Sequence, residues 1–327
     1  MYLIKRNLIK LLMMLILAVG VLPWQGSGGH AQAIITKIET GDRPYMLGLS
    51  SDEGLAYVAN FNGDTVSVIN LDTMAVVNDI PSTSGPTALV VTQDGEKAYV
   101  ANVFSNAVSV LDLTTNENVD RIFVGPTPYA LALSPDNNWL YVVNRQGNSI
   151  SVIDTSDDTR IKNIRTGSEP LDIVFSPDGT MAYVANATSN TISVIDAINH
   201  EDTGNNISTG NRPVDLAISS DGTTVYVANL DDNTIWAINP VTGEKINELN
   251  VGEKPGNIVL TSNEETAYVV RPSQNAIAIV DLSTFTHTGD IEAGNRPVHM
   301  ELLDGDTRAL VSMSDDDEVW LIELSGQ

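Results

Sequence analysis

Short runs of alternating apolar and polar residues recur along the chain from residue 34 onward, and turn-forming residues separate them. One such run is Val108–Asp112, with the sequence Val-Ser-Val-Leu-Asp, and one such turn is Ser176-Pro177-Asp178-Gly179. A period of two is typical of half-buried strands, while Pro and Gly within four residues favour a tight turn. No segment after residue 33 has an apolar stripe of helical period with capping residues. We therefore expect an all-β protein made of short strands.

The strand-like runs repeat with a nearly constant period. Prolines recur 42 residues apart, with a single spacing of 43, at Pro44, Pro86, Pro128, Pro170, Pro213, Pro255 and Pro297. Tyrosines keep the same spacing at Tyr57, Tyr99, Tyr141, Tyr183, Tyr226 and Tyr268, and Leu310 takes the seventh place. Two registers that stay in step over this length indicate seven copies of one supersecondary unit.

Each unit accommodates four strands. The first begins at the repeat proline, the second carries Tyr-Val-Ala-Asn or a variant, the third alternates like Val108–Asp112, and the fourth leads into Gly-x-x-Pro. Repeated four-stranded antiparallel units predict a seven-bladed β-propeller. The segment Ile34–Gly41 matches a fourth strand, whereas the last unit supplies only three strands. We expect the N-terminal strand to complete the last blade and to remove an exposed sheet edge.

The second strands carry the motif that identifies the repeat. They read Tyr57-Val58-Ala59-Asn60, Tyr99-Val100-Ala101-Asn102, Tyr141-Val142-Val143-Asn144, Tyr183-Val184-Ala185-Asn186 and Tyr226-Val227-Ala228-Asn229. Together with the Ser-Pro-Asp-Gly turn, residues 34–327 resemble the YVTN-type, WD-like β-propeller repeat. The resemblance implies an exported or cell-surface propeller of a bacterium or archaeon. The last two units depart from the motif, at Arg271 and at Leu310–Met313.

Relatives with this repeat include surface-layer and adhesion-associated proteins. Related seven-bladed propellers include lactonases, lyases and subunits of periplasmic redox enzymes. Because one propeller scaffold hosts many chemistries, the resemblance leaves the function open.

The first 33 residues have the organisation of a secretory signal. Basic residues at Lys5, Arg6 and Lys10 precede the apolar run Leu11–Leu22, and small residues lead to Ala31-Gln32-Ala33. This order predicts cleavage after Ala33 and an exported protein, whether periplasmic, secreted or cell-surface. The apolar run is shorter than the roughly 20 residues that span a bilayer, so we expect no transmembrane segment after cleavage.

The chain is strongly acidic and has no cysteine. Its 42 Asp and Glu against 17 Lys and Arg give a formal net charge of −25, which makes nucleic acid a poor partner. The absence of Cys excludes disulfides, thiolate catalysis, Cys-based zinc sites and iron–sulfur ligation. The phosphate-loop, Gly-x-Ser-x-Gly, His-Glu-x-x-His and dinucleotide-binding motifs are also absent.

Basic residues gather where we expect one rim of the central channel. The loop entering the first strand and the loop leaving the second emerge on the same face of an antiparallel unit. Residues at these two places are Arg43, Arg145, Arg212, Lys254, Arg271 and Arg296. A cluster of guanidinium groups at a channel mouth is suited to hold a carboxylate or phosphate. The alternative interpretation is that these side chains form ordinary surface ion pairs with rim acids.

A second pattern lies two residues after each repeat proline, at what we call the inner-ring position. It is occupied by Met46, Ala88, Ala130, Asp172, Asp215, Asn257 and His299. The four polar members predict a site in the channel that binds a divalent cation, the one cofactor the sequence suggests. They equally suit an acid–base pair in which His299, Asp172 and Asp215 are the catalytic candidates. The structural alternative is that each one hydrogen-bonds to backbone or channel water.

Two functions of different classes follow from these patterns. The favoured hypothesis is a monomeric, non-catalytic module that presents its rims to a protein, a glycan or a small anion. The alternative hypothesis is a lactonase- or lyase-like enzyme, metal-dependent in one version, in which Arg43 and Arg296 hold the substrate carboxylate.

Overall fold

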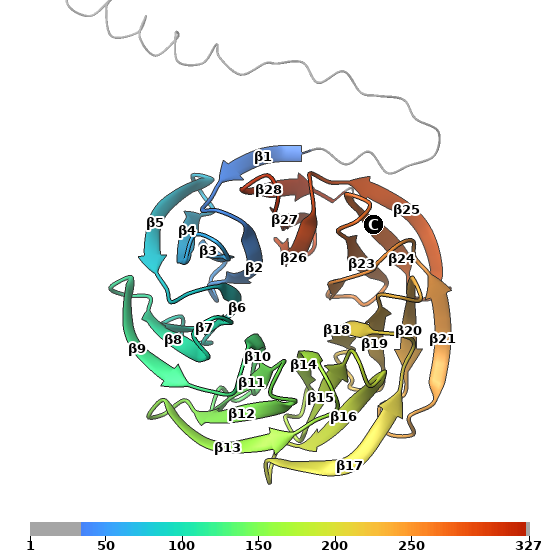
Figure 1. Ribbon diagram of the computed structural model, residues 1–327. Coiled ribbons are helices and arrows are strands. Elements are labelled where there is room, and N and C mark those ends of the chain that lie inside the picture. Colours follow the sequence, from blue (N-terminus) through green and yellow to red (C-terminus); the bar gives the residue numbers. More distant parts are fainter. Residues whose placement is uncertain (1–33, 325–327) are drawn as a thin grey trace, which may run out of the picture. The chain divides into compact units, whose positions relative to one another are not determined.

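The computed structural model describes residues 34–324, so the predicted signal at residues 1–33 lies outside the described part. The described residues form 28 strands and no helix, so no helix among them is long and apolar enough to cross a membrane. The strands form seven separate four-stranded antiparallel sheets arranged in a ring (Figure 1). This arrangement confirms the predicted seven-bladed β-propeller.

Each sheet is one blade, and in blades 1–6 the strands run outward from the channel in chain order. Blade 1 contains β2 (Pro44–Leu49), β3 (Leu55–Asn60), β4 (Thr65–Asn70) and β5 (Ala75–Pro81). Blade 2 contains β6 (Pro86–Val91), β7 (Lys97–Asn102), β8 (Ala107–Asp112) and β9 (Glu117–Phe123). Blade 3 contains β10 (Pro128–Leu133), β11 (Trp139–Asn144), β12 (Ser149–Asp154) and β13 (Thr159–Arg165).

The remaining blades follow the same order. Blade 4 contains β14 (Pro170–Phe175), β15 (Met181–Asn186), β16 (Thr191–Asp196) and β17 (Glu201–Ser208). Blade 5 contains β18 (Pro213–Ile218), β19 (Val225–Asn229), β20 (Thr234–Ile238) and β21 (Lys245–Asn250). Blade 6 contains β22 (Ile258–Leu260), β23 (Thr266–Arg271), β24 (Ala276–Asp281) and β25 (Thr286–Glu292).

Blade 7 joins the two ends of the described chain. It contains β26 (Pro297–Leu303), β27 (Arg308–Met313), β28 (Glu318–Glu323) and, at its outer edge, β1 (Ile34–Glu39) (Figure 1). The strand β1 pairs with β28 from Ile34 opposite Ile322 to Glu39 opposite Glu318. Closure by the N-terminal strand is therefore confirmed.

The core lies between neighbouring blades. Both faces of the middle strands are buried, so that Tyr99 and Val100 of β7 are each 0% exposed, whereas the outer strand β9 is exposed at six of its seven positions. One buried cluster joins Tyr99 and Val110 of blade 2 to Leu131 and Leu140 of blade 3. The period of two in the sequence thus produces sheets that bury apolar surface on both sides, which is the main stabilising contribution to the ring.

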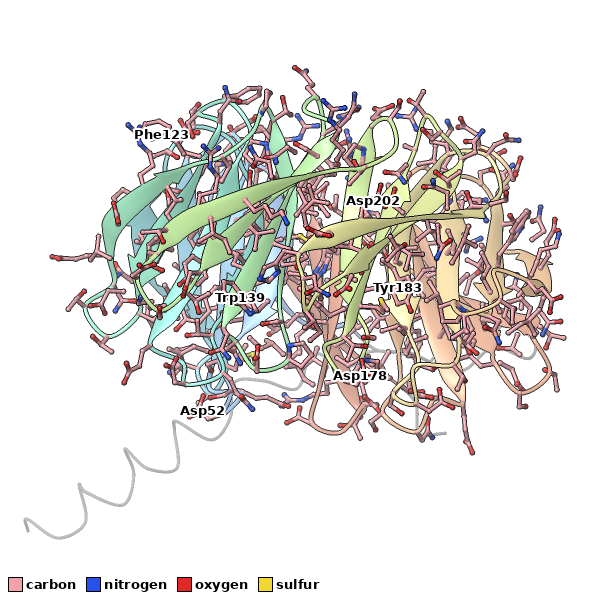
Figure 2. The ribbon with its side chains drawn as sticks, turned by 90° about the horizontal axis from the view of Figure 1, so that it is seen from below. Asp52, Phe123, Trp139, Asp178, Tyr183 and Asp202 are labelled. Carbon is pink, nitrogen blue, oxygen red and sulfur yellow. The ribbon has the colours of Figure 1, made fainter. Side chains whose placement is uncertain are left out.

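The turns between first and second strands of blades 1–6 share a hydrogen-bonded motif on one face of the ring. In blade 1, the hydroxyl of Ser50 donates to Asp52 Oδ1 at 2.6 Å, and the same oxygen accepts the Gly54 N–H at 3.0 Å. These hydrogen bonds hold the pKa of Asp52 below its usual range. The side view shows Asp52 and Asp178 near one edge of the ring and Phe123 at the opposite edge (Figure 2).

Candidate functional site

A cavity of about 900 Å³ occupies the channel at the end where the first strands begin. Its wall includes six of the seven inner-ring positions, namely Met46, Ala130, Asp172, Asp215, Asn257 and His299. Its rim includes the basic residues Arg145, Arg212, Lys254 and Arg296. The residues Asp231, Ser273 and Asp315, from the segments that follow second strands, line the same cavity. The structure thus brings together most residues selected from the sequence.

A left-handed backbone conformation places the basic side chains at the rim. The residue before each repeat proline has positive φ, which is 57° at Arg212, 52° at Lys254 and 54° at Arg296. Residues that precede proline usually adopt extended conformations, and the left-handed region costs an L-residue about 1–2 kcal/mol. The surrounding hydrogen bonds must therefore stabilise the connector.

One hydrogen bond, repeated in all seven blades, supplies this stabilisation. The side-chain oxygen of a left-handed Asn or Asp accepts the N–H of the residue before proline, as Asn190 does for Arg212 at 2.8 Å. The acceptors in chain order are Asp64, Asn106, Asn148, Asn190, Asn233, Asn275 and Asp317. Our sequence analysis missed this set, although Asp or Asn recurs there at the repeat spacing.

The four rim cations differ in how strongly carboxylates engage them. Arg145 binds Glu169 through two nitrogens, with Nε at 3.0 Å. Arg212 lies 3.9 Å from Glu169, and Arg296 lies 3.9 Å from Asp315. Lys254 makes no ion pair with the described residues. In addition, the Nε of Arg212 is buried without a hydrogen-bond acceptor in residues 34–324. Three cations are thus available to an anion, whereas Arg145 is already paired.

Two of the predicted rim cations lie elsewhere. Arg43 is not part of the cavity wall, and its guanidinium group lies 5.4 Å from the ring centre of Phe61. Arg271 is 3% exposed and donates to the Val251 carbonyl, to Gln274 and to Asp290.

The prediction for Arg271 is wrong because the side chain at this position points into its own blade and not toward the channel. The Asn that ends the second strand in blades 1–5 points into its own blade, where Asn60 hydrogen-bonds to Ser67. In blade 6, Arg271 replaces this Asn, and Ala278 stands opposite Val269 where blade 1 has Ser67. An ion pair between the buried Arg271 and the exposed Asp290 therefore replaces the Asn–Ser contact.

Each polar inner-ring side chain hydrogen-bonds to the next blade. The Oδ2 atoms of Asp172 and Asp215 accept the N–H groups of Leu216 and Ile258, each at 2.8 Å. In the same way, Asn257 Oδ1 accepts the Met300 N–H at 3.0 Å, and His299 Nδ1 accepts the Leu47 N–H at 3.4 Å. These contacts agree with the structural alternative given above, in which each polar inner-ring side chain hydrogen-bonds to backbone.

The predicted cation site is not assembled from these side chains. No group of three or more His, Asp or Glu within residues 34–324 is arranged to hold a metal ion. The physical reason is that Asp172, Asp215, Asn257 and His299 each use one acceptor atom for a backbone N–H of the next blade. The metal interpretation of these four residues is therefore wrong for this geometry.

Enclosure in the channel shifts the charge states of the inner ring. Burial raises the pKa values of Asp172 and Asp215 well above their usual range, and the charge of Asp172 raises that of Asp215 further. Hydrogen bonds to both carboxyl groups offset part of this effect. Burial lowers the pKa of His299 to about 4, so its imidazole is neutral at physiological pH.

A further carboxyl group lies next to this ring. Glu301 follows His299 by two residues, which places both side chains on the same face of β26, and its carboxylate lies 3.9 Å from His299 Nε2. Burial raises the pKa of Glu301 to about 7. The sequence analysis missed Glu301, although the six equivalent positions are all Gly, Ala or Val, at Gly48, Val90, Ala132, Val174, Ala217 and Val259.

Aromatic residues cover the opposite side of the mouth. The hydroxyl groups of Tyr45 in blade 1 and Tyr129 in blade 3 hydrogen-bond at 2.7 Å across blade 2. Phe61 packs near Tyr45, with ring centres 6.1 Å apart, and Phe104 packs edge-on against Phe61 at 5.5 Å. The cavity is therefore bounded by Tyr45 and Tyr129 on the side of blades 1–3, where Arg145 is the one charged residue of its lining, and by several charged groups at blades 4–7.

Comparison with known proteins supports the fold and leaves the chemistry open. A family model described as "Lactonase, 7-bladed beta-propeller" matches residues 71–206, from the turn after β4 into β17. Among solved structures, hydrazine synthase from Kuenenia stuttgartiensis aligns with a TM-score of 0.81 and 19% identity, over 93% of this chain and 100% of that chain. No curated protein matches the sequence. The chain is therefore similar to seven-bladed propellers of more than one function.

Proposed function

We propose that this protein is a non-catalytic binding module whose channel mouth captures a small anionic ligand. The observation that carries the proposal is a set of three rim cations, Arg212, Lys254 and Arg296, which line one cavity and have no carboxylate oxygen closer than 3.9 Å among the described residues. The acceptor-free Nε of Arg212 supports it, because a buried unpaired N–H costs about 1–3 kcal/mol that an anion would recover.

The shape of the site favours binding over simple surface ion pairing. Guanidinium groups offer planar, paired donors that match a carboxylate or phosphate. Channel walls of low dielectric concentrate the field of these charges at the mouth. The net charge of −25 repels anions from the protein as a whole, so a bound anion depends on this local cluster.

Calorimetry with defined anions tests the proposal. We expect hexanoate, glutarate or inorganic phosphate to bind the wild type, with an affinity that falls as salt concentration rises. The triple variant Arg212→Gln, Lys254→Gln, Arg296→Gln should lose at least about tenfold in affinity, the effect of about 1.4 kcal/mol. A matched control with the same charge change is Arg160→Gln, Lys162→Gln, Lys245→Gln on the outer strands β13 and β21. Equal affinities of the two triple variants would contradict the proposal.

A lactonase- or lyase-like enzyme is the second candidate, because the lactonase family model matches residues 71–206. In this candidate, the neutral His299 would exchange a proton with the substrate, and Arg296 would hold its carboxylate. The test is hydrolysis of a panel of sugar lactones. Turnover by the wild type that disappears in His299→Ala, with the melting temperature retained, would favour the enzyme over the binding module.

We also propose that the chain is an exported, monomeric member of the YVTN-type repeat proteins. The five Tyr-Val-x-Asn motifs and the order of residues 1–33 support this proposal. N-terminal sequencing of protein secreted by a bacterial host should give Ile34 as the first residue, and light scattering should give the mass of one chain.

A further inference from the structure

The cavity has two layers of different chemistry. Basic side chains occupy the rim, and carboxyl groups occupy the inner ring below it. Arg212 and Asp215 illustrate the two layers, because both line the cavity and Asp215 lies three positions after Arg212 in the chain. Three extended residues span roughly 10 Å. A ligand that contacts both layers therefore needs an anionic group for the rim and an N–H donor group for the carboxyl layer, several bonds apart.

The carboxyl layer is held rigidly in place. The Oδ2 atoms of Asp172 and Asp215 are fixed by the amides of Leu216 and Ile258. The Asn257 side chain also hydrogen-bonds to Asp215, and both carboxyl groups remain on the cavity wall. A site whose donors and acceptors are already oriented binds more tightly, because less freedom is lost on binding.

The protein itself supplies no cation to these carboxyl groups. Burial raises the pKa values of Asp172 and Asp215, the charge of Asp172 raises that of Asp215 further, and hydrogen bonds lower both in part. Neither carboxyl group forms an ion pair with a basic side chain of the described residues. The rim cations instead face Glu169 and Asp315. A ligand ammonium group would supply the missing positive charge together with three N–H donors.

The remaining wall suits a hydrocarbon chain. On the side of blades 1–3, the inner-ring residues that line the cavity are Met46 and Ala130, with Tyr45 and Tyr129 above them. Apolar atoms of a ligand would be removed from water at this wall, at about 25 cal/mol per Å² of apolar area.

We propose that the channel binds a linear zwitterion, an ω-amino carboxylate in chemical class, with its ammonium group at Asp172 and Asp215 and its carboxylate at Arg212, Lys254 and Arg296. This inference rests on the proposed anion-binding function and adds the orientation of the ligand and its second charged group. The apolar body of the ligand lies against Met46 and Ala130. A simple carboxylate of the same length fills only the rim and the apolar wall.

Calorimetry with a matched pair of ligands tests the inference. The pair is 6-aminohexanoate and hexanoate, which differ only in the ammonium group, and 4-aminobutyrate and glycine give the dependence on length. We expect 6-aminohexanoate to bind at least about tenfold more tightly than hexanoate, since hydrogen bonds to charged groups contribute about 1.5–3 kcal/mol. Glycine should bind no better than hexanoate, because it cannot reach both layers.

The decisive variant is Asp172→Asn with Asp215→Asn. Asn257 already accepts an interblade N–H at the same position, so the substituted amides retain the structural contact. The double variant should lose the preference for 6-aminohexanoate and keep the wild-type affinity for hexanoate, while Asp136→Asn in an exposed turn should change neither. Equal binding of both ligands to the wild type would overturn the zwitterion but not the anion site. Failure of both ligands to bind would overturn both.

Discussion

Blades 1–3 and blades 4–7 share one frame and differ in the surface that they turn toward the channel. Both groups have the repeat proline, the left-handed connector and the side chain that stabilises it. At the inner ring, the first group has Met46, Ala88 and Ala130, and the second has Asp172, Asp215, Asn257 and His299. The first group is apolar and covered by aromatic rings, whereas the second hydrogen-bonds to its neighbours along the channel.

The difference separates what the fold requires from what it does not. Three blades close their part of the ring without a polar inner-ring residue, so the propeller does not require one. Burying a carboxyl group costs free energy unless it is paired, and both Asp172 and Asp215 have pKa values raised by this cost. Polar residues that the fold does not require and that are costly to bury are typical of functional sites. The comparison therefore supports the channel side of blades 4–7 as the site.

The largest expected effect comes from opening the ring where the two groups of blades meet. Deleting Ile34–Thr40 removes β1, which pairs with β28 over five residue pairs and buries Ile38 against blades 7 and 1. At about 0.5–1.5 kcal/mol for each net hydrogen bond, the free energy of unfolding should fall by more than about 3 kcal/mol. Denaturant unfolding of chains that begin at residue 34 or at residue 41 measures it. An unchanged midpoint would show that β1 does not close the ring.

An Asp introduced at the inner-ring position of blades 1–3 should destabilise the protein. Ala130→Asp puts a charge at a position that is 3% exposed and equivalent to Asp172. We expect a loss of about 2 kcal/mol at pH 8, which becomes smaller at pH 5 as the new carboxyl group is protonated. The neutral variant Ala130→Asn has nearly the same size and isolates the charge. If both variants were equally stable at pH 8, the two groups of blades would not differ in their tolerance of charge.

His299 should make the protein less stable in acid. Its pKa is about 4 in the folded protein and near 6.5 in the unfolded chain. Between these values the unfolded state binds more protons, so the contribution of His299 to stability decreases as pH falls from 6.5 toward 4. His299→Asn should flatten this part of the stability profile by up to about 3 kcal/mol, because Asn257 shows that an amide can accept the interblade N–H. Parallel profiles of variant and wild type would contradict the buried, neutral state of His299.

The repeat allowed most of the fold and part of the site to be predicted. Spacing of prolines and tyrosines gave the number of blades, and the position of Ile34–Gly41 gave the closure, because both depend on local patterns that recur. The sequence also indicated which residues face the channel. It could not indicate that Asp172 reaches sideways to Leu216, since this depends on the distance between two blades. Arg271 was predicted at the rim because the sequence does not show that its side chain turns toward partners within its own blade, such as Asp290.

Asp172 should have the opposite effect of pH. Its folded pKa is raised above the unfolded value near 4, so the folded state binds more protons above that pH and stability decreases as pH rises. Asp172→Asn should therefore stabilise the protein by about 1 kcal/mol at pH 8 and have little effect near pH 4. Asp136→Asn is the matched control, because hydrogen bonds lower the pKa of this exposed carboxyl group and its removal should not stabilise the protein. Destabilisation of Asp172→Asn at pH 8 would mean that the charged form is favoured in the channel.

The smallest expected effect concerns the one side-chain hydrogen bond that crosses the aromatic wall. Tyr45→Phe removes the hydroxyl that bonds to Tyr129 at 2.7 Å and leaves the Tyr129 hydroxyl, whose pKa is raised mainly by burial, without its partner. The expected cost is about 1 kcal/mol, and Tyr129→Phe should cost about the same. The double variant should cost less than the sum of the two, because no unpaired hydroxyl remains, and a thermodynamic cycle of the four proteins measures this coupling. Additive costs would indicate that water replaces the lost partner, and that the wall at blades 1–3 is wetter than its aromatic composition suggests.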